Sequence, residues 1–474
     1  MQDASVSILS DITTYMKYAR YLPEQGRRET WEEIVERNKS MHMEKFPHLS
    51  SEIRGAYAYV SHKKVVPSMR SMQFAGRAVE TNNARMYNCS FLPIDDVAAF
   101  SEVFFLLLGG TGVGYSVQEG DVAKLPPILA EAELAEDEAP RTFTVEDSIE
   151  GWADSVGELV ETFFYNKKPV RFDYSNIRPK GSPLVTTGGS APGPGPLTQC
   201  HTAIERLLRG VVRERGSGST LRPIEVHDII CHIADAVLAG GIRRAALISL
   251  FSPGDEAMFS AKSGQWWETH PERARANNSV VVDRNAVSES QFREFWEYAQ
   301  RSGSGEPGIF FTNDQRYGAN PCCEISLQPF QFCNLTEINV SNVEDQEDLN
   351  NRARAAAFIG TLQAAYTDFH YVRDVWRETT ESEALLGVSM TGIASGNVLR
   401  LDLEEAAQAA VDENRRAAKK IGINPAARVT AVKPSGTTSL ALGTSSGIHP
   451  WHNDYFVRRI RVGKNEPIYR YLAD

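Results

Sequence analysis

Apolar stretches of two kinds alternate along the chain. Helix-like patterns, with apolar positions on one face or a run closed by glycine, cover residues 97–108, 145–164, 226–238, 353–372 and 403–421. Short strand-like apolar runs lie at residues 246–251, 278–283, 308–311, 335–340 and, less strongly, 428–432. Strands that alternate with helices predict an α/β fold built on parallel strands.

Local signals define several boundaries. Residues 18–46 are charged and helix-compatible, and Thr30 followed by Glu33 has the spacing of a capping box. Gly109 and Gly110 predict the end of the helix over 97–108. Residues 131–138 are acidic and predict a solvated surface segment. Residues 181–196 hold four prolines and five glycines, which fits either a linker or a loop that contacts a ligand.

Composition narrows the class of protein. The chain has 474 residues, of which 42% are hydrophobic, as in ordinary globular proteins. Its longest apolar run, residues 103–108, is too short to span a bilayer, and its N-terminus lacks the pattern of a signal peptide. We therefore expect a cytoplasmic protein whose six cysteines are reduced unless catalytic. A net charge of −11 argues against direct binding to duplex DNA.

The segment from residue 319 to 340 carries the most chemistry. It contains Asn320, Cys322, Cys323, Glu324 and Cys333. If residues 320–324 are extended, the amide, the Cys322 thiol and the carboxylate share one face. This arrangement would place a hydrogen-bond partner, a sulfur reactant and an acid–base group side by side.

Cysteines can also be structural or bind a metal, and the sequence favours neither role near residue 322. A free cysteine is often only a small buried hydrophobe, which is our interpretation of Cys200 and Cys231. The cluster near residue 322 has no C-x2-C pair and no nearby histidine, so we predict no metal site. A structural disulfide is uncommon in an intracellular chain. Redox or radical thiol chemistry remains.

Taken together, several segments resemble the ribonucleotide reductases, most closely the monomeric adenosylcobalamin-dependent type. N-P-C-C-E followed by F-C-N-L-T-E-I-N-V is similar to the family's active-site segment, and Arg85-Met-Tyr-Asn-Cys89-Ser to the segment with its first redox cysteine. Residues 109–116 resemble its glycine-rich turn. The specificity loops are represented by Arg178, Lys180, Gly240, Gly241, Arg243 and Arg244. The substrate phosphate loop is represented by Pro434, Ser435, Gly436, Thr437, Thr438 and Ser439, with residues 446–450.

The phosphate and glycine motifs have competing interpretations. Residues 110–114 follow an apolar helix rather than a strand, which disfavours a dinucleotide-binding turn. Residues 434–439 are not a Walker A loop, because no Gly-Lys-Ser/Thr follows, but such a turn at a helix start can bind phosphate. Taken alone, it could equally be an ordinary Ser/Thr-rich turn. The Arg243–Arg244 pair could likewise be solvated or contact nucleotide.

The resemblance implies a radical reduction of ribonucleotides to 2′-deoxyribonucleotides, with triphosphates as the expected substrates. Cys322 would carry a thiyl radical, Glu324 would act as general base, and Asn320 would bind the substrate hydroxyls. Cys89 and Cys333 would supply two electrons and become a disulfide.

The implied fold is a ten-stranded α/β barrel with a central finger loop carrying Cys322. We expect an N-terminal helical segment at 1–60, the barrel over 61–474, and no N-terminal ATP-cone. The sequence departs from relatives in three ways. It ends 24 residues after Pro450, it has no cysteine after Cys333, and Cys323 stands where relatives usually carry glycine. Tyr469 and Tyr471 are not adjacent, unlike the C-terminal tyrosine pair of two-subunit relatives.

The expected cofactor is adenosylcobalamin. The alternative is a radical supplied by a ferritin-like dimetal subunit. A ribonucleoside diphosphate is likewise the alternative to a triphosphate as substrate. The other expected partners are a deoxynucleotide or ATP effector and a thioredoxin-like or small dithiol reductant. A silent nucleotide-binding regulator would not need Asn320, Cys322 and Glu324 together, and no glycine segment of the glycyl-radical kind follows the barrel.

Overall fold

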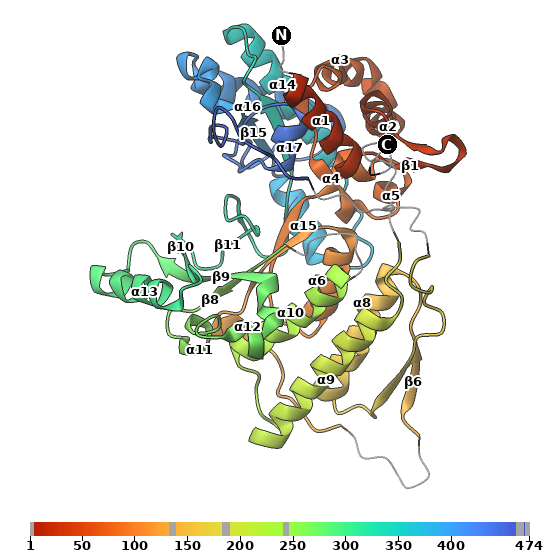
Figure 1. The fold of residues 1–474 in the computed structure, drawn as a ribbon, viewed down its shortest axis with the longest axis vertical. Coiled ribbons are helices and arrows are strands. Elements are labelled where there is room, and N and C mark those ends of the chain that lie inside the picture. The colour runs from red at the N-terminus through yellow and green to blue at the C-terminus, as the bar shows by residue number, and fades with distance from the viewer. Residues whose placement is uncertain (1–3, 132–138, 183–189, 240–245, 461–468, 470–474) are drawn as a thin grey trace. The chain divides into compact units, whose positions relative to one another are not determined.

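The computed structural model describes residues 4–131, 139–182, 190–239, 246–460 and 469. It divides into two compact units (Figure 1). Unit 1 comprises Met1–Arg77, Leu335–Gln363 and Leu386–Asp474, and unit 2 comprises Ala78–Asn334 and Ala364–Leu385. Among the helices of the described ranges, none combines the length and the apolar content that crossing a bilayer requires.

Unit 2 is built on a six-stranded sheet with the order β10-β9-β8-β5-β4-β13. Five strands are parallel, namely β4 (Cys89–Pro93), β5 (Gly112–Ser116), β8 (Leu247–Phe251), β9 (Ala276–Asp283) and β10 (Gly308–Thr312). The short strand β13 (Gln331–Cys333) is antiparallel to β4. Every residue of β5 and β8 is buried, which explains why these strands are continuous apolar or small-residue runs. The predicted α/β class with a central parallel sheet is confirmed.

The helices of unit 2 connect and cover these strands, as parallel connections require. The main ones are α6 (Ala98–Gly109), α8 (Ile149–Phe164), α9 (Gly195–Arg215), α10 (Pro223–Ala239) and α13 (Glu289–Ser302). Helix α8 packs against α6 and α9, and α10 packs against α9 and α6 (Figure 1). Shorter elements are α7 (Glu119–Val122), α11 (Glu256–Phe259), α12 (Trp266–Thr269), α15 (Val375–Glu383), the parallel pair β6 (Arg141–Thr144) and β7 (Val170–Asp173), and the hairpin β11 (Gly318–Ala319) and β12 (Ser326–Leu327).

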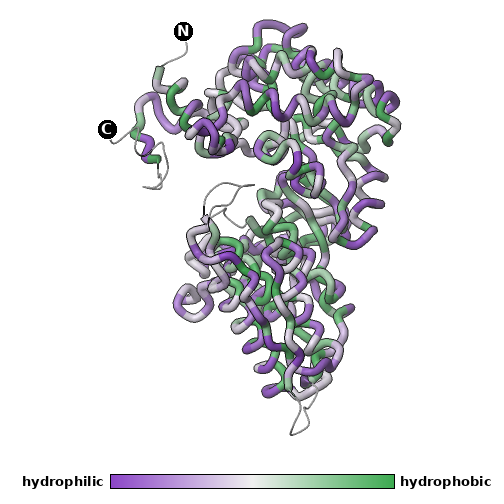
Figure 2. The backbone as a smooth tube through the Cα atoms, turned by 90° about the vertical axis from the view of Figure 1, so that its right-hand side faces the viewer, coloured by the Kyte–Doolittle hydropathy of each residue, from purple (hydrophilic) through white to green (hydrophobic). Residues whose placement is uncertain are grey.

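Unit 1 contains a three-stranded sheet of the order β15-β14-β3. Strand β14 (Leu335–Asn339) is parallel to β15 (Gly387–Thr391) and antiparallel to β3 (Val65–Val66). The other elements are α1 (Ala4–Lys17), the hairpin β1 (Tyr21–Leu22) and β2 (Arg27–Arg28), α2 (Trp31–Lys45), α3 (Ser50–Ser61), α4 (Met69–Phe74), α5 (Arg77–Glu80), α14 (Gln346–Ala364), α16 (Leu403–Ile421) and α17 (Thr437–Ala441), with α5 and α14 ending in unit 2. Hydrophobic and hydrophilic residues alternate along the helices in Figure 2, as expected of helices with one buried face.

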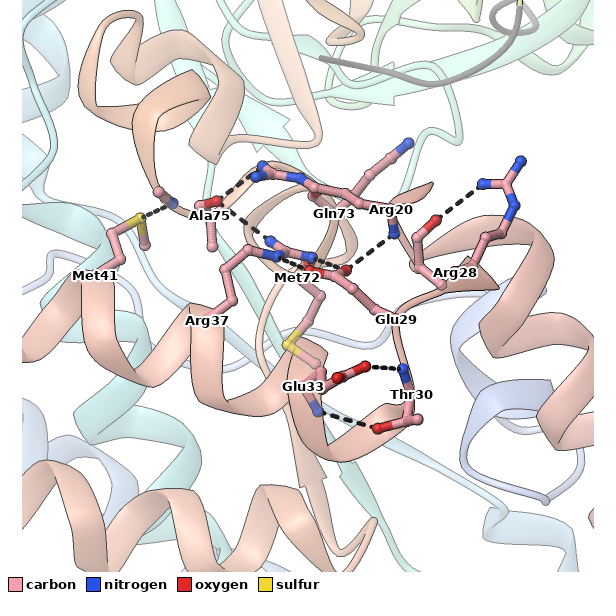
Figure 3. A network of polar contacts seen from close by, with 12 residues as sticks. Arg20, Arg28, Glu29, Thr30, Glu33, Arg37, Met41, Met72, Gln73 and Ala75 are labelled. Atoms are coloured by element: carbon pink, nitrogen blue, oxygen red, sulfur yellow. Dashed lines mark hydrogen bonds and ion pairs between the residues drawn. The ribbon is translucent and has the colours of Figure 1, made fainter. Parts of the chain in front are cut away.

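A polar network fixes the N-terminal part of unit 1 (Figure 3). Glu29 accepts hydrogen bonds from the Arg37 guanidinium at 2.7 and 2.8 Å and from the Arg20 backbone N–H at 2.9 Å. The two arginine side chains also donate to the Ala75 carbonyl, at 2.8 Å from Arg20 and 3.2 Å from Arg37. Because these groups are largely buried, the network ties the β1–β2 hairpin and α2 to the end of α4.

Several boundaries agree with the sequence and others do not. The Thr30–Glu33 capping box is present, α6 ends at Gly110 with φ 92°, and residues 403–421 are the helix α16. The prediction for residues 353–372 is wrong at its end, because α14 stops at Ala364. Residues 18–46 are not one helical stretch, since a hairpin precedes α2. Residues 428–432 form only an isolated bridge from Thr430 to Val388. The acidic segment is described only outside 132–138.

Candidate active site

The loop between β11 and β12 carries the predicted reactive residues. Asn320 is fully buried, whereas Cys322 and Cys323 are exposed. The Asn320 side chain donates to Glu324 Oε2 at 2.8 Å and accepts from the Ile325 backbone N–H at 3.0 Å. The buried Asn320 amide therefore holds the loop together on its inner side, while the two thiols remain accessible to solvent.

The prediction that residues 320–324 are extended is wrong. The Cys323 backbone N–H donates to the Asn320 carbonyl at 2.8 Å, which closes a turn, and Cys323 has φ 63°. This left-handed conformation costs a non-glycine residue of the order of 1 kcal/mol. It explains why glycine suits this position. The turn still brings Asn320 and Glu324 into direct contact.

Glycines allow the loop to lie directly on the sheet. A Cβ on Gly114 would come within 1.9 Å of the Ala319 carbonyl oxygen, and one on Gly318 within 2.1 Å of the Phe91 ring. A Cβ on Gly112 would meet Pro321 at 3.2 Å. Larger side chains at these positions would push the Cys322 loop away from β4 and β5. The glycine-rich turn therefore provides space for the loop as well as ending α6.

Cys89 and Cys333 are directly opposite each other in the antiparallel pair of β4 and β13. Opposed residues in such a pair have Cα atoms roughly 4.5–5.5 Å apart, within the roughly 4.4–6.8 Å that disulfides span. No disulfide joins Cys89 to Cys333 in this structure. Gly112 is the neighbour of Cys89 on the other side, so the Cys322 loop covers the face of the sheet that carries the pair.

The groups around the loop have complementary chemistry. Asn320 Nδ2 lies 3.9 Å from Cys89 Sγ as well as 2.8 Å from Glu324. The second carboxylate oxygen, Glu324 Oε1, is buried without a hydrogen-bond partner. Such an oxygen can accept a proton or hydrogen bond from a ligand. Cys323 is exposed as a residue, but partial shielding of its sulfur from solvent, with a smaller contribution from Glu324, raises the pKa of this thiol to about 11.

The loop Pro434–Ser439 lies in unit 1 and leads into α17. Ser435, Thr438 and Ser439 are buried, while Pro434 and Gly436 are exposed. Ser435 Oγ accepts from the Ser439 backbone N–H at 3.0 Å, and Ser439 Oγ donates to the Ser435 carbonyl at 2.7 Å. Ser446 Oγ also donates to that carbonyl. The hydroxyls thus shape the loop from inside.

The predicted specificity residues are only partly described. Arg178 Nε donates to Asp147 Oδ2 at 2.5 Å, and Lys180 is exposed. The ends of the loop that follows are joined, because the Gly181 N–H donates to the Ala191 carbonyl at 2.9 Å. Gly240, Gly241, Arg243 and Arg244 lie outside the described residues.

One group of side chains in the described part of unit 2 could hold a metal ion. Donor atoms of Asp228, His270 and Glu272 lie within 4.8 Å of one another. Arg273, however, already binds both oxygens of Asp228 at 2.7 Å. The guanidinium provides the positive charge that a cation would bring, so we assign no metal there.

Sequence reasoning missed the groups that hold the loop in place. Glu383 of α15 accepts hydrogen bonds from Gln328 at 2.5 Å and Gln331 at 2.8 Å, which ties β12 and β13 to that helix. No local pattern identifies this distant glutamate. The roles of Gly112 and Gly114 could have been found, because alternate glycines in a strand indicate close approach of another backbone.

Comparisons of sequence and of structure both find similarity to ribonucleotide reductases. A profile described as "B12-dependent ribonucleotide reductase, insertion domain" matches residues 118–208. The adenosylcobalamin-dependent ribonucleoside-triphosphate reductase of Lacticaseibacillus paracasei is 27% identical over 96% of this chain and 75% of its own. The chain is therefore similar to ribonucleotide reductases over nearly its whole length. The enzyme of the same description from Euglena gracilis is 29% identical over 83% of this chain and 54% of its own.

Solved structures of the family have the same fold. A crystal structure of a B12-dependent (class II) ribonucleotide reductase superposes with a TM-score of 0.78 at 24% identity, covering 92% of this chain and 74% of that one. The α subunit of an Actinobacillus ureae class Id reductase gives 0.55 at 12% identity, over 96% of this chain. The profile match falls on the part of unit 2 that contains α7, β6, α8, β7 and the first two thirds of α9.

Proposed function

We propose that this protein reduces ribonucleotides, specifically ribonucleoside triphosphates, to 2′-deoxyribonucleotides. The observation that carries the proposal is the arrangement around Asn320. This buried amide contacts both Glu324 and Cys89, and Cys89 stands opposite Cys333. An acid–base group beside a pair of thiols matches a two-electron reduction at a sugar hydroxyl. The names of the relatives supply the substrate class.

We assign one step to each of these residues. A thiyl radical on Cys322 removes the 3′-hydrogen, and Glu324 takes the proton of the 3′-hydroxyl, a role for which its unpartnered Oε1 is suited. Asn320 holds the substrate hydroxyls. Cys89 protonates the 2′-hydroxyl, which leaves as water. A hydrogen from Cys333 replaces the lost hydroxyl at C2′, and Cys89 and Cys333 together give up two electrons and form a disulfide. Glu324 returns its proton to the 3′-oxygen, and Cys322 returns the hydrogen to C3′, which restores the thiyl radical.

The residues fit a radical cofactor that reaches the loop from outside. Cys322 is exposed at the turn, whereas the groups that would act on the sugar are buried or half-buried. Adenosylcobalamin, on which the relatives depend, supplies the radical when bound, and the Cys322 thiol would face it. A separate dimetal subunit as radical source is the alternative that the test below distinguishes.

The remaining features of the proposal follow the family. The chain forms a ten-stranded α/β barrel whose finger loop is the β11–β12 turn, supported by the fold similarity to a class II reductase. Pro434–Ser439 binds the substrate phosphates, and the loops that contain Arg178, Lys180 and residues 240–244 respond to a deoxynucleotide or ATP effector. A dithiol or thioredoxin-like protein reduces the disulfide, which requires a reducing compartment such as the cytoplasm.

Anaerobic turnover of the purified chain tests this function. We expect deoxynucleotide formation from a ribonucleoside triphosphate and a dithiol only when adenosylcobalamin is present. An electron paramagnetic resonance signal that needs both nucleotide and cofactor would give a readout independent of product. Turnover that instead requires an added dimetal subunit would reject the cofactor and leave the role of Cys322 intact. No reduction under either condition would reject the function.

A further inference from the structure

A buried carboxyl group lies beneath the hydroxyl-rich loop of unit 1. Glu337 is in the middle of β14, is only 3% exposed, and has one oxygen, Oε1, without a hydrogen-bond partner. The sheet register places Ser389 and Val66 beside it on the same face. Ser389 Oγ is also buried and unpartnered. An orphaned carboxyl oxygen in such a place is costly and calls for a specific reason.

The other partners of this carboxyl group belong to the loop and its support. Hydroxyls of Ser435, Thr438 and Thr391 lie within hydrogen-bonding reach of Glu337. Ser435 Oγ accepts from the Ser439 N–H, so its own proton is available to Glu337. The loop Pro434–Ser439 therefore rests on this one side chain through two of its hydroxyls.

Thr391 provides a different kind of contact. Its hydroxyl donates to the Ser445 carbonyl at 2.9 Å and accepts from the Gly447 N–H at 2.9 Å. Since its proton is already used, Thr391 can only accept a hydrogen bond from Glu337, which requires the protonated carboxyl. Ser435 and Thr438 can thus donate hydrogen bonds to the charged form of Glu337, and Thr391 can accept one from its neutral form.

Among the described residues, few charges face this group from the surrounding elements. Lys433 lies just before the loop and favours the charged form. Tyr18, which follows α1, donates to Thr438 Oγ1 at 3.5 Å. The positive charge of Arg70 in α4 interacts electrostatically with Tyr18. Strands β3 and β15 contribute Val66, Ser389 and Thr391 on this face, none of them charged. Burial outweighs Lys433 and the donating hydroxyls of Ser435 and Thr438, and raises the pKa of Glu337 above its ordinary value.

We propose that Glu337 is a positioning residue of the phosphate loop, and that binding of nucleotide phosphate to this loop is coupled to uptake of a proton by Glu337. The inference rests on the proposed function, in which this loop binds the substrate phosphates. A phosphate anion close to a buried carboxylate would be repelled, whereas a neutral carboxyl group is compatible with it and keeps both loop hydroxyls in place.

The direction of the pH dependence follows from charge. Bound phosphate favours the neutral form of Glu337, so its pKa is higher in the complex than in the free protein. Between these two pKa values the complex holds more protons than the free protein. Affinity therefore falls as the pH rises through that window, by at most about tenfold per pH unit for one proton.

Isothermal titration calorimetry in two buffers of different ionisation enthalpy measures the proton uptake. The probe is a ribonucleoside triphosphate, added without cofactor or reductant so that no turnover occurs. We expect the wild type to take up a fraction of a proton that the isosteric Glu337→Gln variant does not. Glu347→Gln, which changes an exposed glutamate of α14 in the same unit, is the matched control and should behave as the wild type. Protonation of the nucleotide itself is common to all three proteins and cancels.

A second measurement needs no variant. Infrared difference spectra of the wild type should gain the band of a protonated carboxyl group when nucleotide is added. Equal proton uptake by the wild type and Glu337→Gln, or no new carboxyl band, would overturn the inference while nucleotide binding still supported the proposed function. Failure of the wild type to bind nucleotide at all would overturn both.

Discussion

The Cys322 loop and the loop Pro434–Ser439 differ in which of their side chains are exposed and in what holds them in place. The first, Gly318–Leu327, leaves its two thiols exposed and is held by a buried amide, by glycines beneath it and by a distant glutamate. The second, Pro434–Ser439, buries three of its hydroxyls and exposes Pro434 and Gly436. In the function that we propose, the side chains of the first loop are the reactants and those of the second are the scaffold.

This difference determines how each region should respond to mutation. On the proposed roles, a change at the tip of the Cys322 loop should remove a reactant and leave the fold intact, whereas added volume beneath the loop should displace it. The phosphate loop depends on a group that is remote in sequence, Glu337, and on its protonation. The following experiments separate reactant, support and strain in the Cys322 loop, from the largest expected effect to the smallest.

Replacement of Cys322 with serine should abolish turnover, by more than about 10³-fold, which corresponds to at least ~4 kcal/mol in the barrier. The oxygen analogue cannot serve as a hydrogen-abstracting radical at comparable energy. Nucleotide binding, measured by calorimetry, should change little because the side chain is exposed. Cys200→Ala, at a buried cysteine outside the loop, is the control and should keep its activity. Substantial activity in Cys322→Ser would remove this residue from the mechanism.

Cys89 and Cys333 should become a disulfide after a single turnover without reductant. Their opposed positions in β4 and β13 allow the bond without backbone movement. Peptide mapping after alkylation should find Cys89 and Cys333 joined in a disulfide and therefore not alkylated. Cys200 and Cys231 should have formed no disulfide, since both are buried. Cys89→Ser should lower steady-state turnover by about 10²-fold or more, because proton and electron delivery are both lost. Product formed with both thiols still reduced would contradict the pairing.

Gly114→Ala tests the support beneath the loop. The added methyl group would come within 1.9 Å of the Ala319 carbonyl oxygen, so the loop must move. A displacement of about 1 Å at a reacting group can cost about 10²-fold in rate, and we expect a loss of this size in kcat. Gly120→Ala is the matched control, because a Cβ there meets nothing within 4 Å. If both variants were equally active, close packing of the loop would have no part in catalysis.

The sequence predicted the two regions unequally. Residue types alone made Asn320, Cys322 and Glu324 candidates, because an amide, a thiol and a carboxylate so close together have few other uses. Their conformation was predicted wrongly, since the alternation argument assumed a strand and a turn at Cys323 replaces it. A single positive φ reverses which side chains share a face, and nothing in the local pattern marks it.

Contacts between residues far apart in the sequence could not be predicted for a related reason. Helix boundaries such as those of α16 depend on local caps and periodicity, which a sequence displays. The contacts of Glu383 with Gln328, and of Glu337 with Ser435, join residues 55 and 98 positions apart, through tertiary packing alone. The register that opposes Cys89 to Cys333 is of the same kind, and only the resemblance to a family suggested the pairing.

Cys323→Gly should have the smallest effect and decides what this unusual residue does. Glycine removes the penalty of the left-handed conformation at φ 63°, worth about 1–2 kcal/mol, while the greater freedom of the unfolded chain offsets up to ~1 kcal/mol. We therefore expect a rise in the midpoint of thermal unfolding of at most a few degrees. Asn166→Gly, at another exposed non-glycine residue with positive φ (48°), controls for the gain from backbone relief. A thiol with a pKa near 11 is a poor nucleophile at neutral pH, so turnover should persist in Cys323→Gly. A loss comparable with that of Cys322→Ser would instead make Cys323 a participant in the thiol chemistry.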